Sequence, residues 1–307
     1  MVNRKDLLDI ASLSVEEIQT ILDHARDMDA IVRSTKASGE LCGKSVFLTF
    51  YENSTRTASS FEHAVKLLGG NCVKLDVGTS SVKKGENLTD TCATLAALGA
   101  DAIVMRHSLA GAPQFVARKL PDVSILNAGD GQHAHPTQCL LDLYTIQSHV
   151  GKDLNGLKVC ILGDIKHSRV ARSDMTALVR MGGQVRVAGP NTLLPQGLEQ
   201  YGVTVCPDSE SAVKGCDVVM LLRLQLKRQT AGIIPSIKEY AAHWQLTAKR
   251  LALASPHAIV MHPGPINRGA ELSSEVADCA QSVILEQVYG GLCVRMAALD
   301  LLINGGN

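Results

Sequence analysis

Short apolar runs alternate along the chain with longer segments whose apolar residues recur at helical spacing. A short apolar run is typical of a buried strand, and repeated strand–helix alternation is typical of parallel sheets crossed by helices. We therefore predict an α/β fold. The expected strands are Ser45–Phe50, Cys72–Val77, Ala102–Met105, Val123–Asn127, Val159–Leu162, Gln184–Ala188, Val203–Val205, Val218–Leu222 and Ile259–Met261, and the main expected helices are Ser14–Ile31, Leu88–Leu98, Thr137–Ser148, Arg172–Met181 and Ser274–Tyr289.

A polar break at residues 149–156 (HVGKDLNG) divides this series into two parts. We predict two doubly wound parallel-sheet lobes, residues 1–149 and 150–287, with the active site between them, because such sheets bind ligands at the carboxyl ends of their strands. The last helical run, Ala280–Ile303, is too long for a simple terminal cap. We expect a C-terminal helix, 288–307, to pack back on the first lobe.

Composition and charge exclude several classes of function. The 307 residues include 30 Lys and Arg and 30 Asp and Glu, so the formal net charge of zero argues against a nucleic-acid or anionic-membrane surface. No apolar run approaches the roughly 18 residues of a membrane span, and the N-terminus lacks the apolar stretch of a signal peptide. The nine cysteines are scattered and never form a C-x-x-C pair, which favours reduced thiols in a cytoplasmic protein.

The strongest local signal lies in residues 44–70, where a strand ends and a helix begins near Ser54. Ser54, Thr55 and Thr57 fall in the first helical turn, where backbone N–H groups lack partners and the helix dipole is positive. Together with Arg56 they predict a site for a phosphate-sized anion. The alternative is that Ser54 only caps the helix, but an arginine in the first turn opposes the dipole and indicates a compensating anion.

A second helix start carries His135 and Gln138. A histidine at a helix N-terminus tends to stay neutral, so it can donate a hydrogen bond to a carbonyl oxygen. The preceding GDGQHA (129–134) matches G-x-G-x-x-A, but no acidic strand end follows at the spacing of a dinucleotide site. His133 and His135 could instead form half of a metal site, although no further His, Cys or carboxylate cluster has ligand spacing.

Arginines stand at four strand ends, where a structural protein has little use for them. They are Arg56, Arg106, Arg169 and Arg223. Guanidinium groups match phosphate and carboxylate bidentately, so four of them at the carboxyl edges of parallel strands predict a multiply charged anionic ligand. Two loops add to this: residues 78–88 contain Lys83 and Lys84 and are either a surface loop or a cationic lid, and residues 261–269 (MHPGPINRG) offer a rigid backbone whose carbonyls can accept hydrogen bonds.

These segments resemble the aspartate/ornithine carbamoyltransferase family. F-x-E-x-S-T-R-T (50–57) matches its carbamoyl-phosphate signature, and H-P-T-Q (135–138) is its second landmark. K-K-G-E (83–86), G-D-x-K-x-x-R (163–169), L-R-x-Q (222–225) and H-P-G-P-x-N-R-G (262–269) resemble the aspartate branch. The match runs from about residue 4 to 303, and it departs at Ala58, where many relatives carry an arginine.

The resemblance implies a reaction and one set of ligands. The reaction would transfer the carbamoyl group of carbamoyl phosphate to L-aspartate, giving N-carbamoyl-L-aspartate and phosphate for de novo pyrimidine synthesis, with no cofactor and no metal. Residues 1–149 with 288–307 would then bind carbamoyl phosphate, and 150–287 would bind aspartate. The catalytic residues would be Arg56, Thr57, Arg106 and His135, and the other carbamoyl-phosphate ligands would be Ser54, Thr55, Gln138, Gly264 and Pro265.

For L-aspartate, the resemblance implies that Arg169 and Arg223, helped by Gln225, bind the two carboxylates. Lys84 would reach in from a neighbouring subunit of a homotrimer, to which regulatory or dihydroorotase-like chains could be added. The family also implies that Glu52 pairs with Arg169 and Arg228 when the lobes close.

Three alternatives stay open at this point. The amine could be ornithine or a relative, although with one carboxylate to bind Arg223 would be left without a partner. A metal hydrolase built on His133 and His135 is a second alternative. The third is a non-catalytic scaffold. A scaffold has no need of the full set of candidate residues, which are Arg56, Arg106, His135, Lys84 and Arg223.

Overall fold

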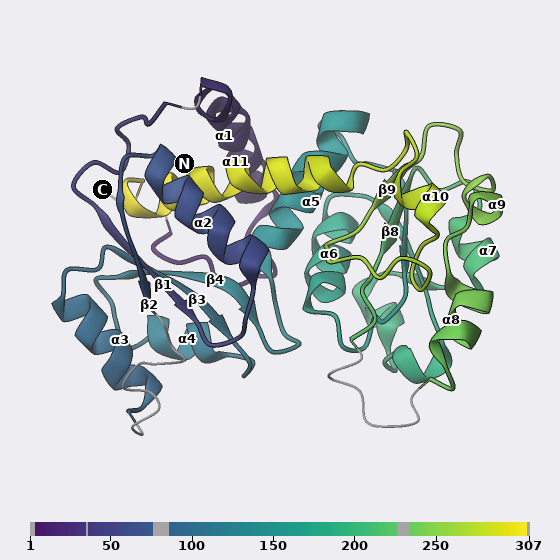
Figure 1. Ribbon diagram of the computed structural model, residues 1–307, viewed down its shortest axis with the longest axis horizontal. Coiled ribbons are helices and arrows are strands. Elements are labelled where there is room, and N and C mark those ends of the chain that lie inside the picture. The colour runs from purple at the N-terminus through teal and green to yellow at the C-terminus, as the bar shows by residue number, and fades with distance from the viewer. Residues whose placement is uncertain (1–3, 35, 76–85, 226–233, 306–307) are drawn as a thin grey trace. The chain divides into compact units, whose positions relative to one another are not determined.

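The computed structural model of the protein describes residues 4–34, 36–75, 86–225 and 234–305, and it contains two compact units (Figure 1). The first unit comprises Met1–Tyr144 and Tyr289–Asn307, and the second comprises Thr145–Val288. Two helices, α5 (Pro136–Val150) and α11 (Ile284–Ile303), continue from one unit into the other.

The first unit is built on a parallel sheet with the strand order β2-β1-β3-β4. Consecutive residues of β1, β3 and β4 are buried, as expected for a parallel sheet covered by helices, whereas the edge strand β2 is only partly buried. The N-terminal segment extends this sheet, because Leu7 forms a parallel bridge with Leu126 of β4. The strands are β1 (Ser45–Phe50), β2 (Asn71–Leu75), β3 (Ala102–His107) and β4 (Ser124–Asp130).

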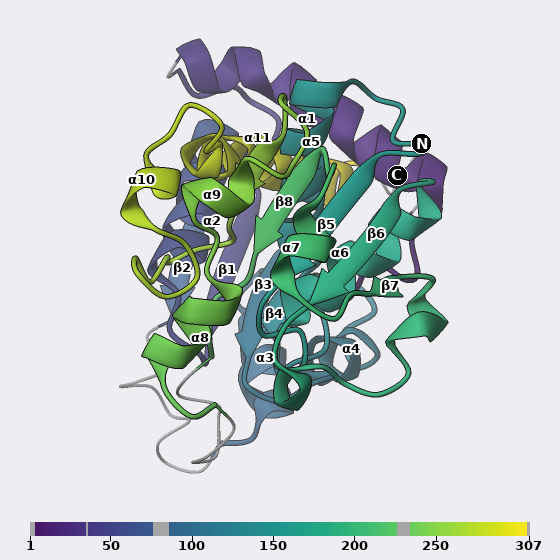
Figure 2. The same cartoon turned by 90° about the vertical axis from the view of Figure 1, so that its right-hand side faces the viewer.

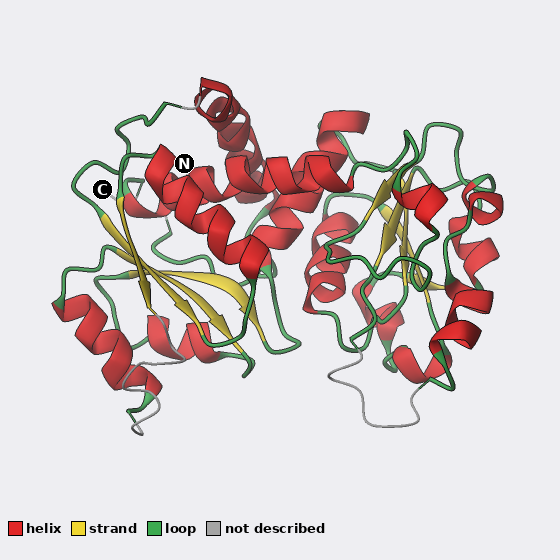
Figure 3. Cartoon of the chain, viewed as in Figure 1, coloured by secondary structure: helices red, strands yellow, loops and turns green. Residues whose placement is uncertain are grey.

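Helices cover both faces of this first sheet (Figure 3). Inward side chains of α3 and α4, among them Leu95 and Val116, pack against Ile103 and Ile125 on one face. The opposite face is covered by α1, α2 and the last part of α11 (Figure 1). The helices are α1 (Val15–Ser34), α2 (Thr55–Leu67), α3 (Leu88–Ala97) and α4 (Ala112–Ala117).

The second unit contains a five-stranded parallel sheet with the order β7-β6-β5-β8-β9, seen from another side in Figure 2. The apolar face of α7 (Ala212, Val213) and the segment around α9 (Leu246, Leu251) pack on one side of it. The strands are β5 (Lys158–Leu162), β6 (Gln184–Ala188), β7 (Thr204–Val205), β8 (Val218–Leu221) and β9 (Ile259–Met261); the helices are α6 (Arg169–Arg180), α7 (Ser209–Val213), α8 (Ile237–Trp244), α9 (Ala248–Leu251) and α10 (Ser274–Ala277), with short 3₁₀ turns at Asn191–Leu193 and Leu198–Tyr201.

The α/β prediction with two parallel sheets is confirmed, and each predicted strand has a counterpart, although the end of the strand predicted at 72–77 lies outside the described residues. One predicted helix, Ser274–Tyr289, is wrong. The chain leaves the helix after Ala277, and its backbone pairs with β9 through hydrogen bonds from Val260 N to Gln281 O (2.8 Å) and from Val283 N to Val260 O (3.0 Å). The free edge of β9 thus competes with the helix for these peptide groups, and α11 begins only at Ile284.

None of the described helices is long and apolar enough to cross a membrane.

All nine cysteines are free thiols in the structure, and most are buried among apolar side chains. Burial raises the pKa of Cys92 and of Cys293 to about 12, so these thiols stay protonated and unreactive at neutral pH.

A half-buried ion pair between α1 and α11 predicts a pH-dependent stability. His24 Nε2 lies 2.7 Å from Asp300 Oδ2, and this hydrogen bond raises the pKa of His24 above its ordinary value. A raised pKa stabilises the fold below the unfolded value of about 6.5, and the contribution is lost as the pH rises through the folded pKa. We expect His24→Gln to cost about 1 kcal/mol in urea unfolding near pH 5.5 and much less near pH 9.

The exposed His257 in the second unit supplies the control, because its imidazole makes no ion pair with any residue that the structure describes. An equal cost of His24→Gln at both pH values would contradict this account of the α1–α11 contact.

Candidate active site

The register of the first sheet brings three candidate segments to one edge. Phe50 at the end of β1 stands opposite Arg106 of β3, and His107 stands opposite Asp130 at the end of β4. The ladder continues one step further through a hydrogen bond from Tyr51 N to Arg106 O (2.8 Å). The segments that follow these strands carry Ser54–Thr57, Arg106 and His135, so the structure places the predicted residues of this unit at neighbouring strand ends.

The first turn of α2 has the geometry of an anion site. Ser54 occupies the N-cap position with extended backbone angles, but its side chain makes no capping hydrogen bond, so the capping-only interpretation is wrong. No acidic residue lies in this turn, where Thr55 and Arg56 are exposed and Thr57 is buried. The backbone N–H groups of this turn have no partner within the helix, and together with the hydroxyls of the turn they can bind a phosphate group.

Arg106 is held against the sheet edge by two contacts. Its Nη1 donates to the carbonyl oxygen of Ala128 (3.3 Å), and its Nε lies 3.3 Å from Glu52 Oε2. The side chain of Arg106 is only 14% exposed, so this ion pair is partly shielded from water. An anionic ligand at Arg106 must therefore compete with Glu52. The expected pairing of Glu52 with Arg169 and Arg228 stays a prediction, since Arg228 lies outside the described residues.

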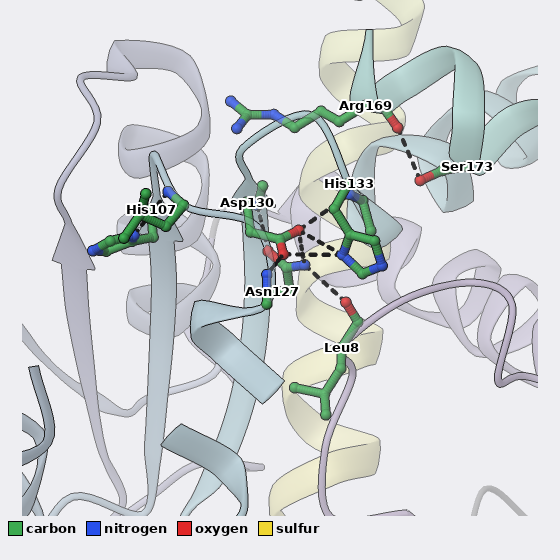
Figure 4. Close-up of polar contacts among 11 residues, drawn as sticks. Leu8, His107, Asn127, Asp130, His133, Arg169 and Ser173 are labelled. Carbon is green, nitrogen blue, oxygen red and sulfur yellow. Dashed lines mark hydrogen bonds and ion pairs between the residues drawn. The ribbon is translucent and has the colours of Figure 1, made fainter. Parts of the chain in front are cut away.

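A fully buried carboxylate organises the loop that leads to His135 (Figure 4). Asp130 accepts hydrogen bonds from Asn127 Nδ2 (2.8 Å), the backbone N–H groups of Gly111 (2.6 Å) and Ala134 (3.1 Å), and His133 Nδ1 (3.0 Å). Asn127 also donates to Leu8 O (2.8 Å), which ties the loop to the N-terminal segment. One carboxylate thus fixes the ends of β4 and the start of α4 against the segment before His135.

His135 and Gln138 stand at the start of α5, as the sequence predicted. The His135 carbonyl accepts hydrogen bonds from the N–H groups of Gln138 and Cys139 (3.1 Å each), and both His135 and Gln138 are buried. His133 instead turns to Asp130. Within the described part of the chain, no three His, Cys, Asp or Glu side chains gather as a metal site.

The second sheet presents its own group of candidate residues. β5, β8 and β9 are adjacent, with Leu162 opposite Leu221 and Met220 opposite Met261, so the segments after these strands meet at one carboxyl edge. Arg169 begins α6 and is buried, its carbonyl accepting a hydrogen bond from Ser173 Oγ (3.1 Å, Figure 4). In the segment after β8, Arg223 Nε is buried and has no hydrogen-bond partner among the described residues.

Two buried carboxylates hold these segments in place: Asp164, which belongs to the G-D-x-K-x-x-R motif, and Glu271, which the sequence analysis did not single out. Asp164 Oδ2 accepts from the N–H of Gln225 (3.3 Å), while its Oδ1 accepts from His167. Glu271 accepts from the N–H of Leu224 (3.0 Å) and from Asn267 N and Nδ2 (2.7 Å each). The loops after β5, β8 and β9 are therefore joined through two acceptors, and Glu271 lacked any sequence signal beyond its charge near the H-P-G-P segment.

The H-P-G-P segment is fixed by His262. Its Nδ1 accepts a hydrogen bond from the N–H of Gly264 (2.7 Å), which leaves the proton of the neutral ring on Nε2, toward Glu271 (4.0 Å). The following Gly264–Pro265 peptide bond is cis. This arrangement determines where the backbone of Gly264 and Pro265 lies within the unit. Lys83 and Lys84, for which the sequence left a surface loop and a cationic lid open, lie outside the described residues.

Two domains of a known protein family match this chain. Residues 5–148 match the carbamoyl-P binding domain of aspartate/ornithine carbamoyltransferases, and residues 155–302 match their Asp/Orn binding domain. The chain belongs to the aspartate/ornithine carbamoyltransferase family. The matches cover almost the whole chain and follow the order of the motifs.

Individual relatives distinguish the two branches of this family by sequence more than by fold. The chain is 52% identical over 307 residues to the aspartate carbamoyltransferase catalytic subunit of Moorella thermoacetica, covering 100% of this chain and 99% of that protein. Aspartate transcarbamoylase from Trypanosoma cruzi, solved with N-(phosphonacetyl)-L-aspartic acid, has a TM-score of 0.85 at 32% identity (96% and 95% covered). Ornithine carbamoyltransferase from Thermus thermophilus has a TM-score of 0.86 at 27% identity (98% and 99% covered).

Proposed function

We propose that this chain transfers the carbamoyl group of carbamoyl phosphate to the α-amine of L-aspartate, giving N-carbamoyl-L-aspartate and phosphate, the step that commits carbamoyl groups to pyrimidine synthesis. The observation that carries this proposal is the 52% identity, over its full length, to an aspartate carbamoyltransferase catalytic subunit. The second arginine of the aspartate-type segments, Arg223, adds support, because ornithine offers only one carboxylate for Arg169 and Arg223 to bind.

The edge of the first sheet supplies the groups that carbamoyl phosphate needs. The phosphate binds the first turn of α2 through Ser54, Thr55, Arg56 and Thr57. Arg106, His135 and Thr57 donate hydrogen bonds to the carbonyl oxygen. Gln138, with the backbone of Gly264 and Pro265, holds the amino group.

The edge of the second sheet binds aspartate. Arg169 and Arg223 each take one carboxylate bidentately, and Gln225 supports them. Two bound carboxylates leave the amine as the free end of the substrate. The sequence ranges of these two roles are 1–149 with 288–307 for carbamoyl phosphate and 150–287 for aspartate.

The reaction follows from these positions. The deprotonated amine attacks the carbonyl carbon, a tetrahedral intermediate with an oxyanion forms, and the C–O bond to phosphate breaks. Donors aimed at that oxygen stabilise the developing charge by ~3–4 kcal/mol each, and holding two charged substrates together removes part of the entropic barrier. The departing phosphate accepts the amine proton, so no protein base is needed.

The assembly and location of the enzyme extend the proposal. Lys84 enters the site from a neighbouring subunit of a homotrimer, and the term "catalytic subunit" in the names of the relatives is consistent with further chains, regulatory or dihydroorotase-like. We place the enzyme in the cytoplasm. Activity recovered on mixing Lys84→Ala and Arg56→Ala subunits would support the shared site, and no recovery would count against it.

A colorimetric assay of the ureido product tests the reaction itself. We expect product with carbamoyl phosphate and L-aspartate, and at least a hundredfold less when L-ornithine replaces aspartate, because a missing buried charge pair costs several kcal/mol. Activity should be insensitive to chelators. Turnover with ornithine but not aspartate, or no turnover with either, would refute the proposed function.

A further inference from the structure

The side-chain amide of Gln138 has a defined orientation. Its Nε2 donates to both carboxylate oxygens of Asp142, one turn further along α5, at 3.1 Å and 3.3 Å. Both side chains are buried, with Asp142 only 1% exposed. An ionised carboxylate only accepts hydrogen bonds, so the NH₂ group must face Asp142 and Oε1 must point away from it. Among the residues that the structure describes, none donates a hydrogen bond to this Oε1.

The first unit also holds a buried arginine, which lies on α11. Arg295 is 4% exposed, and its Nη1 donates to Ser60 Oγ on α2 (3.0 Å) and to the carbonyl oxygen of Gly291 (2.9 Å). Its guanidinium carbon lies 5.3 Å from the centre of the Phe61 ring. A core helix that carries a buried cation needs an anion nearby, since an uncompensated buried charge is strongly disfavoured.

The charge of Asp142 acts on this buried cation. Burial lowers this pKa to about 10, the charge of Asp142 opposes the shift, and the charge of Arg56 adds to it. The interaction is mutual, because a nearby cation favours the ionised form of a carboxylate. An ionised Asp142 cannot donate a hydrogen bond to Gln138. In the reversed amide orientation, Oε1 of Gln138 would face the Asp142 carboxylate, and two acceptors would stand against each other.

We propose that Asp142 and Arg295 are positioning residues, which keep the Oε1 of Gln138 turned toward the ligand and thereby select an NH₂ group over a methyl group next to the carbonyl carbon. Carbamoyl phosphate and acetyl phosphate differ in this group alone and are nearly equal in shape. A neutral acceptor at that place distinguishes them, because the NH₂ donates and the methyl cannot. The inference rests on the proposed function, in which Gln138 binds the carbamoyl amino group.

Two stable phosphonates test the selection by calorimetry on the full-length protein. Phosphonoacetamide carries the NH₂ group, and 2-oxopropylphosphonate carries a methyl in its place. We expect the wild-type protein to bind the amide about tenfold more tightly, since one hydrogen bond to this group is worth about a factor of ten. Asp142→Asn, whose amide can donate as well as accept, should lower the ratio of the two Kd values several-fold while leaving the Kd for inorganic phosphate within about twofold.

Two further variants complete the experiment. Asp300→Asn is the control, because it removes a partly buried carboxylate of the first unit that pairs with His24 and not with Gln138. This variant should keep the tenfold ratio of the two Kd values. Arg295→Gln removes the cation and should lower the ratio as Asp142→Asn does. If neither Asp142→Asn nor Arg295→Gln binds phosphate, the wild-type ratio decides, and a value near one overturns the proposal.

The outcomes separate this inference from the proposed function. Wild-type protein that carbamoylates aspartate, with a probe ratio that Asp142→Asn leaves unchanged, overturns the positioning role alone. Wild-type protein that does not carbamoylate aspartate overturns the proposed function, whatever the ratio. A merely structural role of Asp142 would weaken the binding of both probes and of phosphate together.

Discussion

Arg56→Ala is expected to lower kcat/KM for carbamoyl phosphate by about 10²- to 10³-fold. Arg56 lies in the first turn of α2, where Ser54 makes no capping hydrogen bond and no acidic residue is present. A phosphate bound there would lose a charge-assisted, bidentate partner and keep only the hydroxyls and backbone N–H groups, a loss of about 3–4 kcal/mol. Steady-state kinetics at saturating aspartate measures the effect.

Two variants sharpen this prediction. Arg56→Lys keeps the charge without the fork and should fall between wild type and Arg56→Ala. Arg118→Ala removes an exposed arginine at the end of α4 in the same unit and should leave kcat/KM within about twofold. If Arg56→Ala retained more than a tenth of the wild-type kcat/KM, the proposal that the first turn of α2 binds the phosphate would be wrong.

Arg223→Ala is expected to raise the KM for aspartate about a hundredfold with little change in the KM for carbamoyl phosphate. Arg223 follows β8, and its neighbours Leu224 and Gln225 are anchored by Glu271 and Asp164, so its backbone is held in place while its Nε lacks a partner among the described residues. Removing the guanidinium leaves one substrate carboxylate uncompensated, at a cost of about 2–3 kcal/mol.

The matched control for this second prediction lies in the same unit. Arg180 is exposed at the last turn of α6, the opposite end of that helix from Arg169, and Arg180→Ala should leave both KM values within about twofold. Unchanged aspartate dependence in Arg223→Ala would show that this residue does not bind a substrate carboxylate.

Local patterns predicted the parts of the fold that depend on local physics. The apolar run at 45–50 forms β1 as predicted. The helix expected to begin near Ser54 begins at Thr55 as α2. The helix predicted at 274–289 failed because its peptide groups pair with β9, a competition that depends on a strand distant from the pattern itself. The short helices α4 and α8 were likewise missed, since neither is long enough to show several turns of helical spacing.

The sequence likewise predicted some features of the candidate site and not others. Arginines at strand ends could be predicted because the carboxyl ends of parallel strands share an edge, and the registers of both sheets bring the predicted segments of each unit to such an edge. The hydrogen-bond donors that the buried acids Asp142, Asp164 and Glu271 meet could not be predicted, since nothing in the local sequence indicates them. Arg295 is a further example, because the local sequence does not show that this arginine is buried and donates to Ser60 of α2.

The most direct test of the central claim is a crystal structure of this protein with N-(phosphonacetyl)-L-aspartate, which joins a phosphonate and an aspartate in one molecule. The account predicts that the phosphonate contacts the N–H groups of the first turn of α2 and the guanidinium of Arg56, and that the two carboxylates contact Arg169 and Arg223. A bound analogue whose phosphonate lies away from this turn, or whose carboxylates avoid both arginines, would contradict it.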